Sequence, residues 1–475
     1  MNMHSRSAFW SILLSLLLIS GMPDARAQIG TPGPRLTWLG TADGNWSIAY
    51  DVSAFGHIVV GYYQQVEGLS VQNIRLFRWT KSDGMETAIL PDRTGRARGL
   101  SHDGTTFVGS ALLTLTQAFR WHPDNPDQDQ NGQPDVLPLE TPGYNSGEAR
   151  AVSSDGGVIV GAVYNWSLLG GASPREAFRW TETDGLQLLG TLGGEASLAE
   201  NVSADGAIVV GSAQNQFGKY HAFRWTAADG MQPLGTLMYV LYDSSTATAV
   251  SDDGSVVVGW AHVPGNDVLV AFRVDNGVLS ELAGPTAYPQ TQAYDVTADG
   301  SMVVGVMFNE NGERRAFRWT DGVGLEDLSA VYADLLTPVG SYLRTAQAIS
   351  PNGRYIVGQG FNAATGRFEA FLLDTWQTTA ADATPMLPTA AELLPPAPNP
   401  FTRATTITLR LPVAQPVRLE VIDLQGRSVR TLIDGWLPEG THRVRFESRS
   451  LAPGLYLCRL QATSGPTYRT LLLLR

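Results

Sequence analysis

One pattern recurs seven times along the chain, and it limits the possible folds more than any other feature. Its fullest copy runs from Ala151 to Gly190 and contains a Val-Ser pair, an Asp-Gly turn, a β-branched run ending in Gly, and Ala-Phe-Arg-Trp. The copies follow one another at spacings of 46 to 53 residues. Their turn glycines are Gly56, Gly104, Gly156, Gly206, Gly254, Gly300 and Gly353. Such a period is typical of stacked supersecondary units, none of which buries its apolar face alone.

A full copy contains four short segments with strand character, and no copy has a segment with the length or period of a helix. The Asp-Gly pair favours a tight hairpin because Gly adopts positive φ without steric cost. Four antiparallel strands per repeat predict a blade of a β-propeller. The seventh copy lacks a fourth strand, and Leu36–Gly40 matches that missing strand. We therefore predict an all-β fold, a seven-bladed β-propeller closed by an N-terminal strand, with an open solenoid as the alternative.

The repeated residues are expected to be structural. Phe178 and Trp180 fall on one face of their strand and Arg179 on the other. Arginine next to tryptophan predicts packing between blades, with the arginine stem against an aromatic ring. The Ser and Asp of each Ser-x-Asp-Gly turn are expected to cap the hairpin.

Composition and the chain ends predict four regions. Residues 1–27 have the features of a secretory signal peptide: Arg6, an apolar core and an Ala-x-Ala site ending at Ala27. Residues 28–376 form the propeller, 377–393 a Thr/Ala/Pro-rich linker, and 394–475 a small Ig-like β-sandwich of about seven strands. Cys458 is the sole cysteine, so no disulfide within the molecule is possible. We expect a monomer with no transmembrane span, and the net charge of −12 argues against a nucleic-acid partner.

The C-terminal region resembles the sorting domain of the bacterial type IX secretion system. The matching segments are Pro398–Phe401, Thr405–Ile407, Val421–Arg427, Gly440–His442, Leu451–Tyr456 and the Leu-rich end. The resemblance implies that residues 394–475 engage the type IX secretion machinery, that the protein is secreted or anchored at the outer surface, and that this domain is often removed. The alternative is a plain Ig-like module without a sorting role.

The repeats are similar to the HAF family of extracellular repeats. The similarity rests on Ala-Phe-Arg-Trp together with Ser-x-Asp-Gly-x-x-Val-Val-Gly, and the His-Ala-Phe triplet is intact at His221–Phe223. It implies an extracellular propeller but carries no assigned activity, and no catalytic residue transfers with it.

Irregular loops point to one face of the propeller as the ligand face. The loops between the second and third strands vary among the copies, and variation within a repeat array concentrates where binding happens. Aromatic side chains with neighbouring amides suit sugar or protein surfaces, so we expect a polysaccharide or cell-surface protein ligand; the alternative is that the rings only pack the loops. The candidate ligand-binding residues are Tyr62, Tyr164, Trp166, Tyr220 and Trp260.

An insertion after Trp121 contains a possible Ca²⁺ site. Asp127, Asp129, Asn131 and Asp135 offer oxygen donors at positions 1, 3, 5 and 9 of a calcium-type loop, with Gly132 at position 6. The bidentate Glu expected at position 12 is missing, since Pro138 stands there. The alternative is a solvated acidic turn.

No catalytic set is evident in the sequence. The histidines are scattered without metal-ligand spacing, and there is no Gly-x-Ser-x-Gly elbow and no phosphate loop. Our first hypothesis is a secreted or surface-anchored binding propeller without catalysis. The second is a propeller glycoside hydrolase or polysaccharide lyase, which requires two carboxylates about 5 to 10 Å apart near the channel mouth.

Overall fold

The computed structural model describes most of residues 33–375 and 391–474. The gaps are residues 68–69, 88–93, 113–114, 123–124, 126–136, 168–170, 235–243, 264–267, 338, 395, 397–398, 400, 403, 412–414, 424, 438–439, 449–450 and 464. The predicted signal peptide and most of the predicted linker lie outside the described residues. The chain divides into two compact units, up to and after residue 376, and each is described by itself. Among the described residues, no helix has both the length and the apolar character needed to cross a bilayer.

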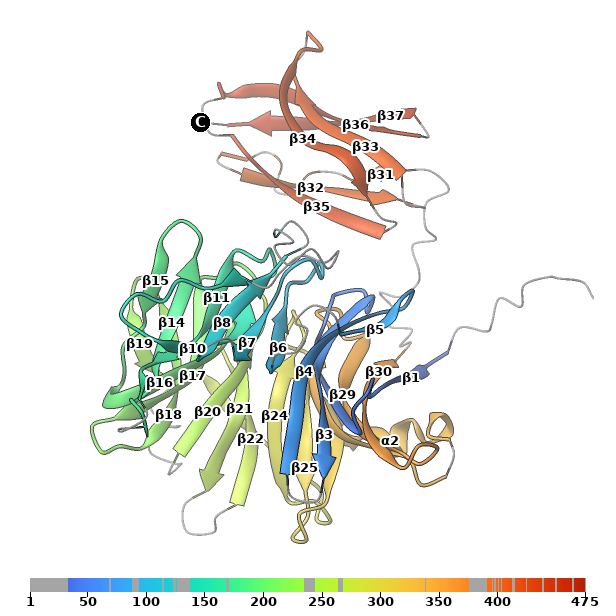
Figure 1. Cartoon of the computed structure of the whole chain (residues 1–475). Coiled ribbons are helices and arrows are strands. Elements are labelled where there is room, and N and C mark those ends of the chain that lie inside the picture. Colours follow the sequence, from blue (N-terminus) through green and yellow to red (C-terminus); the bar gives the residue numbers. More distant parts are fainter. Residues whose placement is uncertain are drawn as a thin grey trace, which may run out of the picture. The chain divides into compact units, whose positions relative to one another are not determined.

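The first unit consists of antiparallel sheets that follow one another along the chain (Figure 1). Its described strands group into seven four-stranded blades, so the predicted all-β propeller fold is confirmed. The first three blades are β2 (Trp46–Val52), β3 (Ile58–Glu67), β4 (Ser70–Thr80) and β5 (Gly84–Glu86); β6 (Gly95–Leu100), β7 (Phe107–Leu112), β8 (Thr116–Trp121) and β9 (Leu137–Pro138); and β10 (Ser146–Val152), β11 (Val158–Tyr164), β14 (Glu176–Thr181) and β15 (Gly185–Leu188). The third blade also carries a hairpin of β12 (Trp166–Ser167) and β13 (Gly171–Ala172).

The remaining blades repeat this order, and the seventh takes its outer strand from the N-terminal end of the unit. They are β16 (Gly193–Val202), β17 (Ile208–Asn215), β18 (Tyr220–Thr226) and β19 (Gly230–Pro233); β20 (Ser244–Val250), β21 (Val256–Val263), β22 (Val268–Asp275) and β23 (Val278–Leu282); β24 (Gln290–Val296), β25 (Met302–Phe308), β26 (Arg314–Thr320) and β27 (Gly324–Asp327); and β28 (Tyr342–Ile349), β29 (Tyr355–Asn362), β30 (Arg367–Asp374) and β1 (Arg35–Gly40).

Strand β1 pairs with the seventh blade, as the predicted closure of the ring requires. It pairs antiparallel with β30, from Arg35 opposite Asp374 to Gly40 opposite Ala370. The Trp38 ring meets that of Phe371 edge to face at 6.5 Å between centroids. This pairing covers an edge of β30 that would otherwise expose unpaired N–H and C=O groups.

A chain of backbone hydrogen bonds links the turns between the first and second strands of successive blades. The amide of Ala54 donates to the carbonyl of His102, and the series continues in the same direction to the carbonyl of Pro351 in the seventh blade. The donors and acceptors are Ala54, His102, Ser154, Ala204, Asp252, Ala298 and Pro351. Proline has no N–H, so the series cannot continue from Pro351 back to the first blade. Strand β1 therefore seals the one junction that this series cannot bridge.

The innermost strand of every blade contains a β-bulge at the same position. In β2, for example, Ala49 is opposite Gly61 and Asp51 is opposite Val60, which leaves Tyr50 as the extra residue. A bulge turns the side chain of its extra residue out of the regular alternation. We call the seven bulged residues the bulge ring: Tyr50, Arg98, Arg150, Glu200, Thr248, Tyr294 and Gln347.

The repeated residues have the structural roles expected for them. In the turn at Ser203, the hydroxyl donates to Asp205 at 2.7 Å and accepts from the amide of Ile208 at 3.0 Å. The Phe of each Ala-Phe-Arg-Trp segment described is fully buried. The Arg120 guanidinium lies over the Trp180 ring of the next blade, 5.5 Å from its centroid, which joins neighbouring blades as predicted.

One element was not anticipated. A four-residue helix, α2 (Leu328–Val331), and a 3₁₀ turn, Ala333–Leu335, connect the sixth and seventh blades. Asp327 caps α2 by accepting from the amide of Ser329. Leu328 is buried in the core between these two blades. The helix is a single turn, too short to produce a periodic signal in sequence.

The second unit is a sandwich of two sheets around a buried apolar core. Asn399 donates to the carbonyl of Thr470 and accepts from the amide of Leu472, so this residue is held against the last strand. Burial raises the pKa of the Cys458 thiol to about 12, so it stays protonated and unreactive. The sheets are β31 (Glu392–Leu393), β32 (Ala404–Leu411) and β35 (Gly440–Glu447), and β34 (Ser428–Leu437), β33 (Gln415–Ile422), β36 (Gly454–Ala462) and β37 (Gly465–Leu473).

Candidate ligand-binding channel

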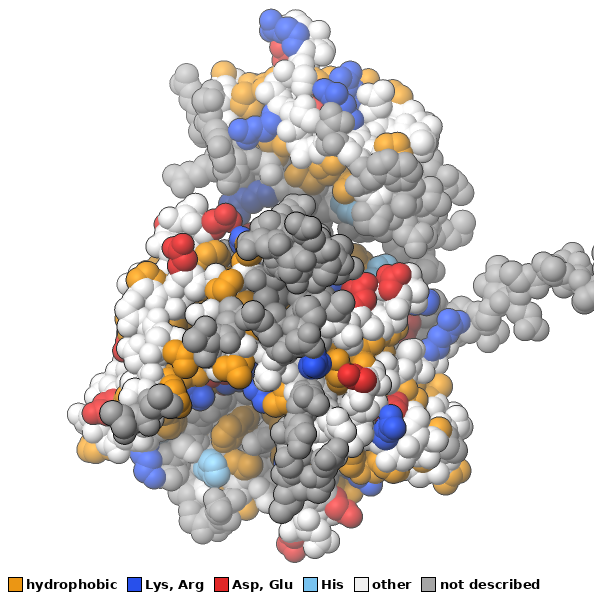
Figure 2. Space-filling model, in the orientation of Figure 1, with side chains coloured by type: hydrophobic (Ala, Val, Ile, Leu, Met, Phe, Trp, Pro, Cys, Tyr) orange, Lys and Arg blue, Asp and Glu red, His pale blue; other side chains and the backbone are white. Residues whose placement is uncertain are grey.

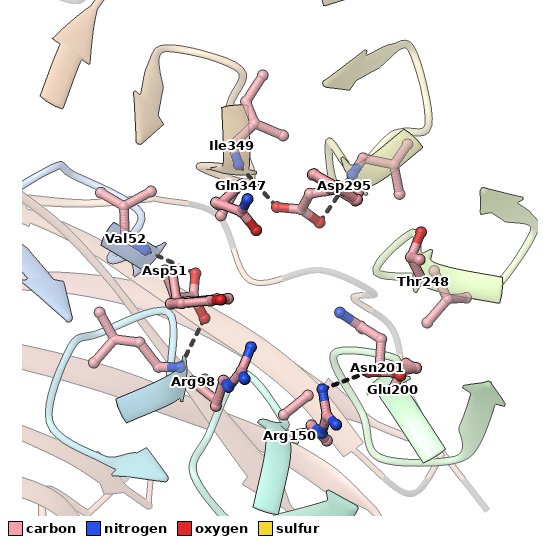
Figure 3. Close-up of a pocket in the computed structure, with 18 of the residues that line it drawn as sticks. Asp51, Val52, Arg98, Arg150, Glu200, Asn201, Thr248, Asp295, Gln347 and Ile349 are labelled. Carbon is pink, nitrogen blue, oxygen red and sulfur yellow. Dashed lines mark hydrogen bonds and ion pairs between the residues drawn. The ribbon is translucent and has the colours of Figure 1, made fainter. Parts of the chain in front are cut away.

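The bulge ring lines a central channel of about 730 Å³ in the propeller. Figure 3 shows members of the ring coming from the inner strands of different blades and pointing into one shared space. Its side chains are two phenols, two guanidinium groups, one carboxylate, one hydroxyl and one amide. The volume lies within the range of small-molecule and cofactor sites, which is about 300–1,000 Å³.

One mouth of the channel is rich in aromatic and basic side chains. Trp46, Tyr220 and Arg314 are each the first residue of a strand that starts at this end of its blade. Trp260 and Arg344 line the channel with them. Because strands alternate in direction, this end also carries the connections between second and third strands, which the sequence singled out as variable.

At the opposite end, an ion-pair contact joins two blades across the channel. His102 of the second blade lies 3.7 Å, from Nε2 to Oδ1, from Asp252 of the fifth blade. Burial lowers the pKa of His102, while the carboxylates of Asp252 and Asp103 act in the opposite direction. The imidazole is therefore expected to be mostly neutral at pH 7.

Two carboxylates in the channel connect neighbouring blades. Asp51 accepts from the amides of Val52 and, in the next blade, Leu100, both at 2.7 Å. Asp295 accepts in the same way from Val296 and Ile349 at 2.8 Å. Figure 3 shows both sets of bonds. Each carboxylate thus uses both oxygens to join two inner strands.

These two acids have raised pKa values. Burial raises the pKa of Asp51 to about 8, with a further increase from the charge of Asp295, against the effect of its two backbone donors. Burial likewise raises the pKa of Asp295 to about 7. Burial also raises the pKa of Glu200, whereas the neighbouring Arg150 lowers it. The Arg150 guanidinium lies 3.5 Å from Glu200 and 3.2 Å from Glu148.

The raised pKa values predict that this propeller loses stability as the pH rises. Between about pH 4 and pH 8 the folded state binds more protons at Asp51 and Asp295 than the unfolded state, where the pKa is near 3.8. Their contribution is complete below pH 4 and is lost by about pH 8, with a slope of at most about 1.4 kcal/mol per pH unit for each group. Denaturant unfolding across this range measures it.

The matched variant for this prediction is Asp51→Asn with Asp295→Asn. The chain already carries Asn201 at the corresponding position of the fourth blade, where its side-chain oxygen accepts from the amide of Val202. The double variant should flatten the pH dependence, whereas Asp321→Asn in the exposed β26–β27 turn should not. An unchanged slope in the double variant would contradict the assignment.

The channel-end histidine gives a second titration prediction. We expect NMR titration to place the pKa of His102 below 6.5, because burial is the largest influence on it. Asp252→Asn should lower that pKa further, since the carboxylate favours the imidazolium. An unchanged pKa of His102 in this variant would show that the contact across the channel does not form in solution.

The structure places the predicted ligand residues in two groups. Tyr220 and Trp260 line the channel. Tyr62 does not, because its ring packs against Trp46 and Tyr50, with centroids 5.5 and 5.7 Å away. Tyr164 lies under the guanidinium of Arg175, and Trp166 is 39% exposed in the β12–β13 hairpin; neither is part of the channel lining.

Sequence reasoning missed most of the channel lining, including the bulge ring. A usable signal exists in the repeat itself. The residue that follows the repeated Ala of the first strand, as Arg150 follows Ala149, changes chemistry from copy to copy while that Ala is present in all seven copies. A variable polar residue at a fixed place in a repeat marks a position facing a shared space.

The calcium prediction falls on residues that are not described. Asp127, Asp129, Asn131 and Asp135 lie within the gap 126–136. In the part of the chain that is described, no group of three or more His, Cys, Asp or Glu side chains is arranged to hold a metal ion.

The C-terminal unit matches a known family. Residues 397–473 match the secretion system C-terminal sorting domain. This domain directs proteins through the secretion machinery, so the protein is secreted or displayed at the cell surface. Comparison of the chain with curated proteins gave no match.

Solved structures similar to the chain include other propellers. TolB from Acinetobacter baumannii is 13% identical with a TM-score of 0.39, over 68% of this chain and 65% of that one. PorZ, an essential surface component of the type IX secretion system of Porphyromonas gingivalis, is 12% identical with a TM-score of 0.40, over 92% and 60%. The propeller domain of the Trilobed protease from Pyrococcus furiosus is 10% identical with a TM-score of 0.42, over 70% and 98%. Likenesses this distant carry no information on activity.

Proposed function

We propose that the protein is a surface binding protein whose propeller takes a segment of polysaccharide into the mouth of the central channel. The observation that carries this proposal is the convergence of Trp46, Tyr220 and Trp260 with polar members of the bulge ring in one cavity. Aromatic rings stack on the apolar faces of sugars, and amide, hydroxyl and guanidinium groups bond to the sugar hydroxyls. The repeats would then act as an extracellular scaffold of the HAF type, and the protein as a monomer.

The sorting domain supports a location at the cell surface for this binding protein. Deletion of residues 394–475 should leave the propeller on the inner side of the outer membrane, because the signal for the secretion machinery is lost. Immunodetection on intact cells and in the culture medium, compared with cell lysates, measures the effect. Surface display of the truncated chain at the level of the full chain would contradict the sorting role.

A glycan array tests the binding role directly. The mature full chain should bind at least one polysaccharide, and Trp260→Ala should weaken that binding about fivefold to thirtyfold, because a stacking ring contributes roughly 1–2 kcal/mol. Trp166→Ala is the matched control, since its ring lies outside the channel lining. Running the array in calcium and in chelator tests the predicted calcium loop at Asp127. Absence of any hit would overturn the proposal.

An enzymatic role is the second candidate, and Asp51 and Asp295 are the observation that favours it. They face one cavity, and their raised pKa values suit proton transfer. Against catalysis, both oxygens of each carboxylate already accept backbone N–H groups. We expect no product release from polysaccharides that the array identifies, and a reducing-end assay on wild type and Asp51→Asn decides between the two candidates.

A further inference from the structure

Four arginines and four acids line the channel, so its lining is formally balanced, although the whole chain carries −12. Its lining includes four arginines, Arg98, Arg150, Arg314 and Arg344. Arg150 is paired with Glu148 and Glu200. The other three form no ion pair with a carboxylate among the described residues. On the outer surface in view, by contrast, acidic and basic side chains are interspersed with apolar ones (Figure 2).

The acids in the channel do not pair with the arginines at its mouth. Burial raises the pKa of Asp51 to about 8 and that of Asp295 to about 7, so both carboxyls are mostly protonated in mildly acidic solution. Glu200 is paired with Arg150, and Asp252 lies beside His102 at the end of the channel opposite this mouth. In mildly acidic solution the mouth that contains Arg314 and Arg344 therefore has a positive potential, which attracts and orients anions.

Arg344 is held in place by its neighbours. Its Nη1 donates to Oε1 of Gln359 at 3.0 Å, and Nε2 of Gln359 donates in turn to the carbonyl of Ser47. Its guanidinium lies over the Phe368 ring, 4.8 Å from the centroid. One nitrogen is thus fixed by an amide and one face by a ring, which leaves further N–H groups for a ligand.

Arg314 belongs to the same mouth. Its guanidinium lies over the Phe308 ring, 5.2 Å from the centroid, and the side chain is exposed. Burial is the largest cause of the lowered pKa of Arg344, and the charge of Arg314 is the next. The same charge acts to lower the pKa of Tyr294, against the larger effect of burial. Two like charges placed together without an acid cost free energy, and a bound anion removes that cost.

We propose that Arg314 and Arg344 form an anion-recognition site, and that the polysaccharide bound at this mouth is an acidic one whose carboxylate or sulfate groups they hold. This inference rests on the proposed function and narrows it to a class of ligand. Trp46, Tyr220 and Trp260 would stack on the sugar rings while the two arginines bind the charged substituents.

Isothermal titration of the mature full chain tests the site. The probes are an oligogalacturonate, which carries carboxylates, a heparin oligosaccharide, which carries mainly sulfates, a neutral cello-oligosaccharide, and polyglutamate. We expect at least one acidic oligosaccharide to bind at least tenfold more tightly than the neutral one, and its affinity to fall as salt is added. Which acidic probe binds identifies the anion.

Three variants separate recognition from folding. Arg344→Gln and Arg314→Gln should each weaken binding of the acidic probe about tenfold, as expected for loss of a charge-assisted bond. Because Arg314 is exposed, its variant should keep the wild-type melting temperature even if Arg344→Gln loses stability. Arg35→Gln, an exposed residue in outer strand β1, makes the same change in net charge and should bind as wild type.

Each other outcome overturns a distinct claim. Equal binding of neutral and acidic saccharides, unaffected by the arginine variants, overturns the anion site but leaves the binding function intact. Preference for polyglutamate over every saccharide replaces the polysaccharide with an acidic peptide partner. Failure of all saccharides overturns the proposed function and this inference together.

Discussion

Replacing Gly211 by alanine is expected to lower the free energy of unfolding of the propeller by more than about 3 kcal/mol. Gly211 lies opposite the bulge of its blade, and a Cβ built on it would overlap the backbone carbonyl oxygen of Leu198. A backbone atom cannot move aside by changing rotamer, so the bulge that presents Glu200 must distort. Chemical denaturation of the purified chain measures the loss, and tryptophan fluorescence reports the transition.

Gly157→Ala is the matched control for this prediction. Gly157 follows a turn glycine, and the corresponding residue of the next blade is already an alanine, Ala207. Its added Cβ would approach only the Asp155 side chain, at 3.2 Å. We expect a change below about 1 kcal/mol. Equal stability of the Gly211 and Gly157 variants would show that the bulge tolerates a side chain opposite it.

Removal of residues 28–41 is expected to destabilise the propeller by several kcal/mol and to promote aggregation. Leu36 and Trp38 are partly buried against the core between the last two blades, and full burial of such a side chain contributes about 1.5–3 kcal/mol, which is an upper bound for each. The deletion also exposes the edge of β30, which can then pair with another chain. Thermal unfolding and light scattering at rising protein concentration measure the two effects.

A shorter truncation isolates the contribution of β1. Removing residues 28–32 alone leaves the strand in place and should change neither measurement. Adding a synthetic peptide of residues 33–42 to the longer truncation should restore part of the lost stability by occupying the vacant edge. If the longer truncation melts like the full chain, β1 does not seal the ring.

The sequence was sufficient for the architecture because the repeat carries its own turn and core signals. Asp-Gly turns, buried Phe residues such as Phe178, and the unmatched segment Leu36–Gly40 each predicted a feature that the structure contains. Helix α2 was not predicted because a single helical turn is too short to show hydrophobic periodicity. The sorting domain was recognised from short motifs such as Pro398–Phe401, and the family match covers that region.

The candidate site was harder to predict because it is assembled from separate blades. Tyr220 and Trp260 were selected as loop aromatics, and both line the channel. Arg314 and Arg344 come from different blades, and only the ring geometry brings them to one mouth. Tyr62 was selected by the same rule as Tyr220, yet its ring is packed between Trp46 and Tyr50. Side-chain direction at a bulge depends on pairing register, which a sequence pattern does not specify.

The proline at the end of the turn series bears on how a ring of this kind can change its number of blades. A blade duplicated within the series from Ala54 to Ala298 brings its own amide and carbonyl, so the neighbouring turns meet the same partners as before. A blade added after Pro351 would follow a turn that accepts a hydrogen bond but cannot donate one. Duplication and loss of blades are therefore expected to occur before the seventh repeat, with the last repeat and the N-terminal strand inherited together as one closing unit.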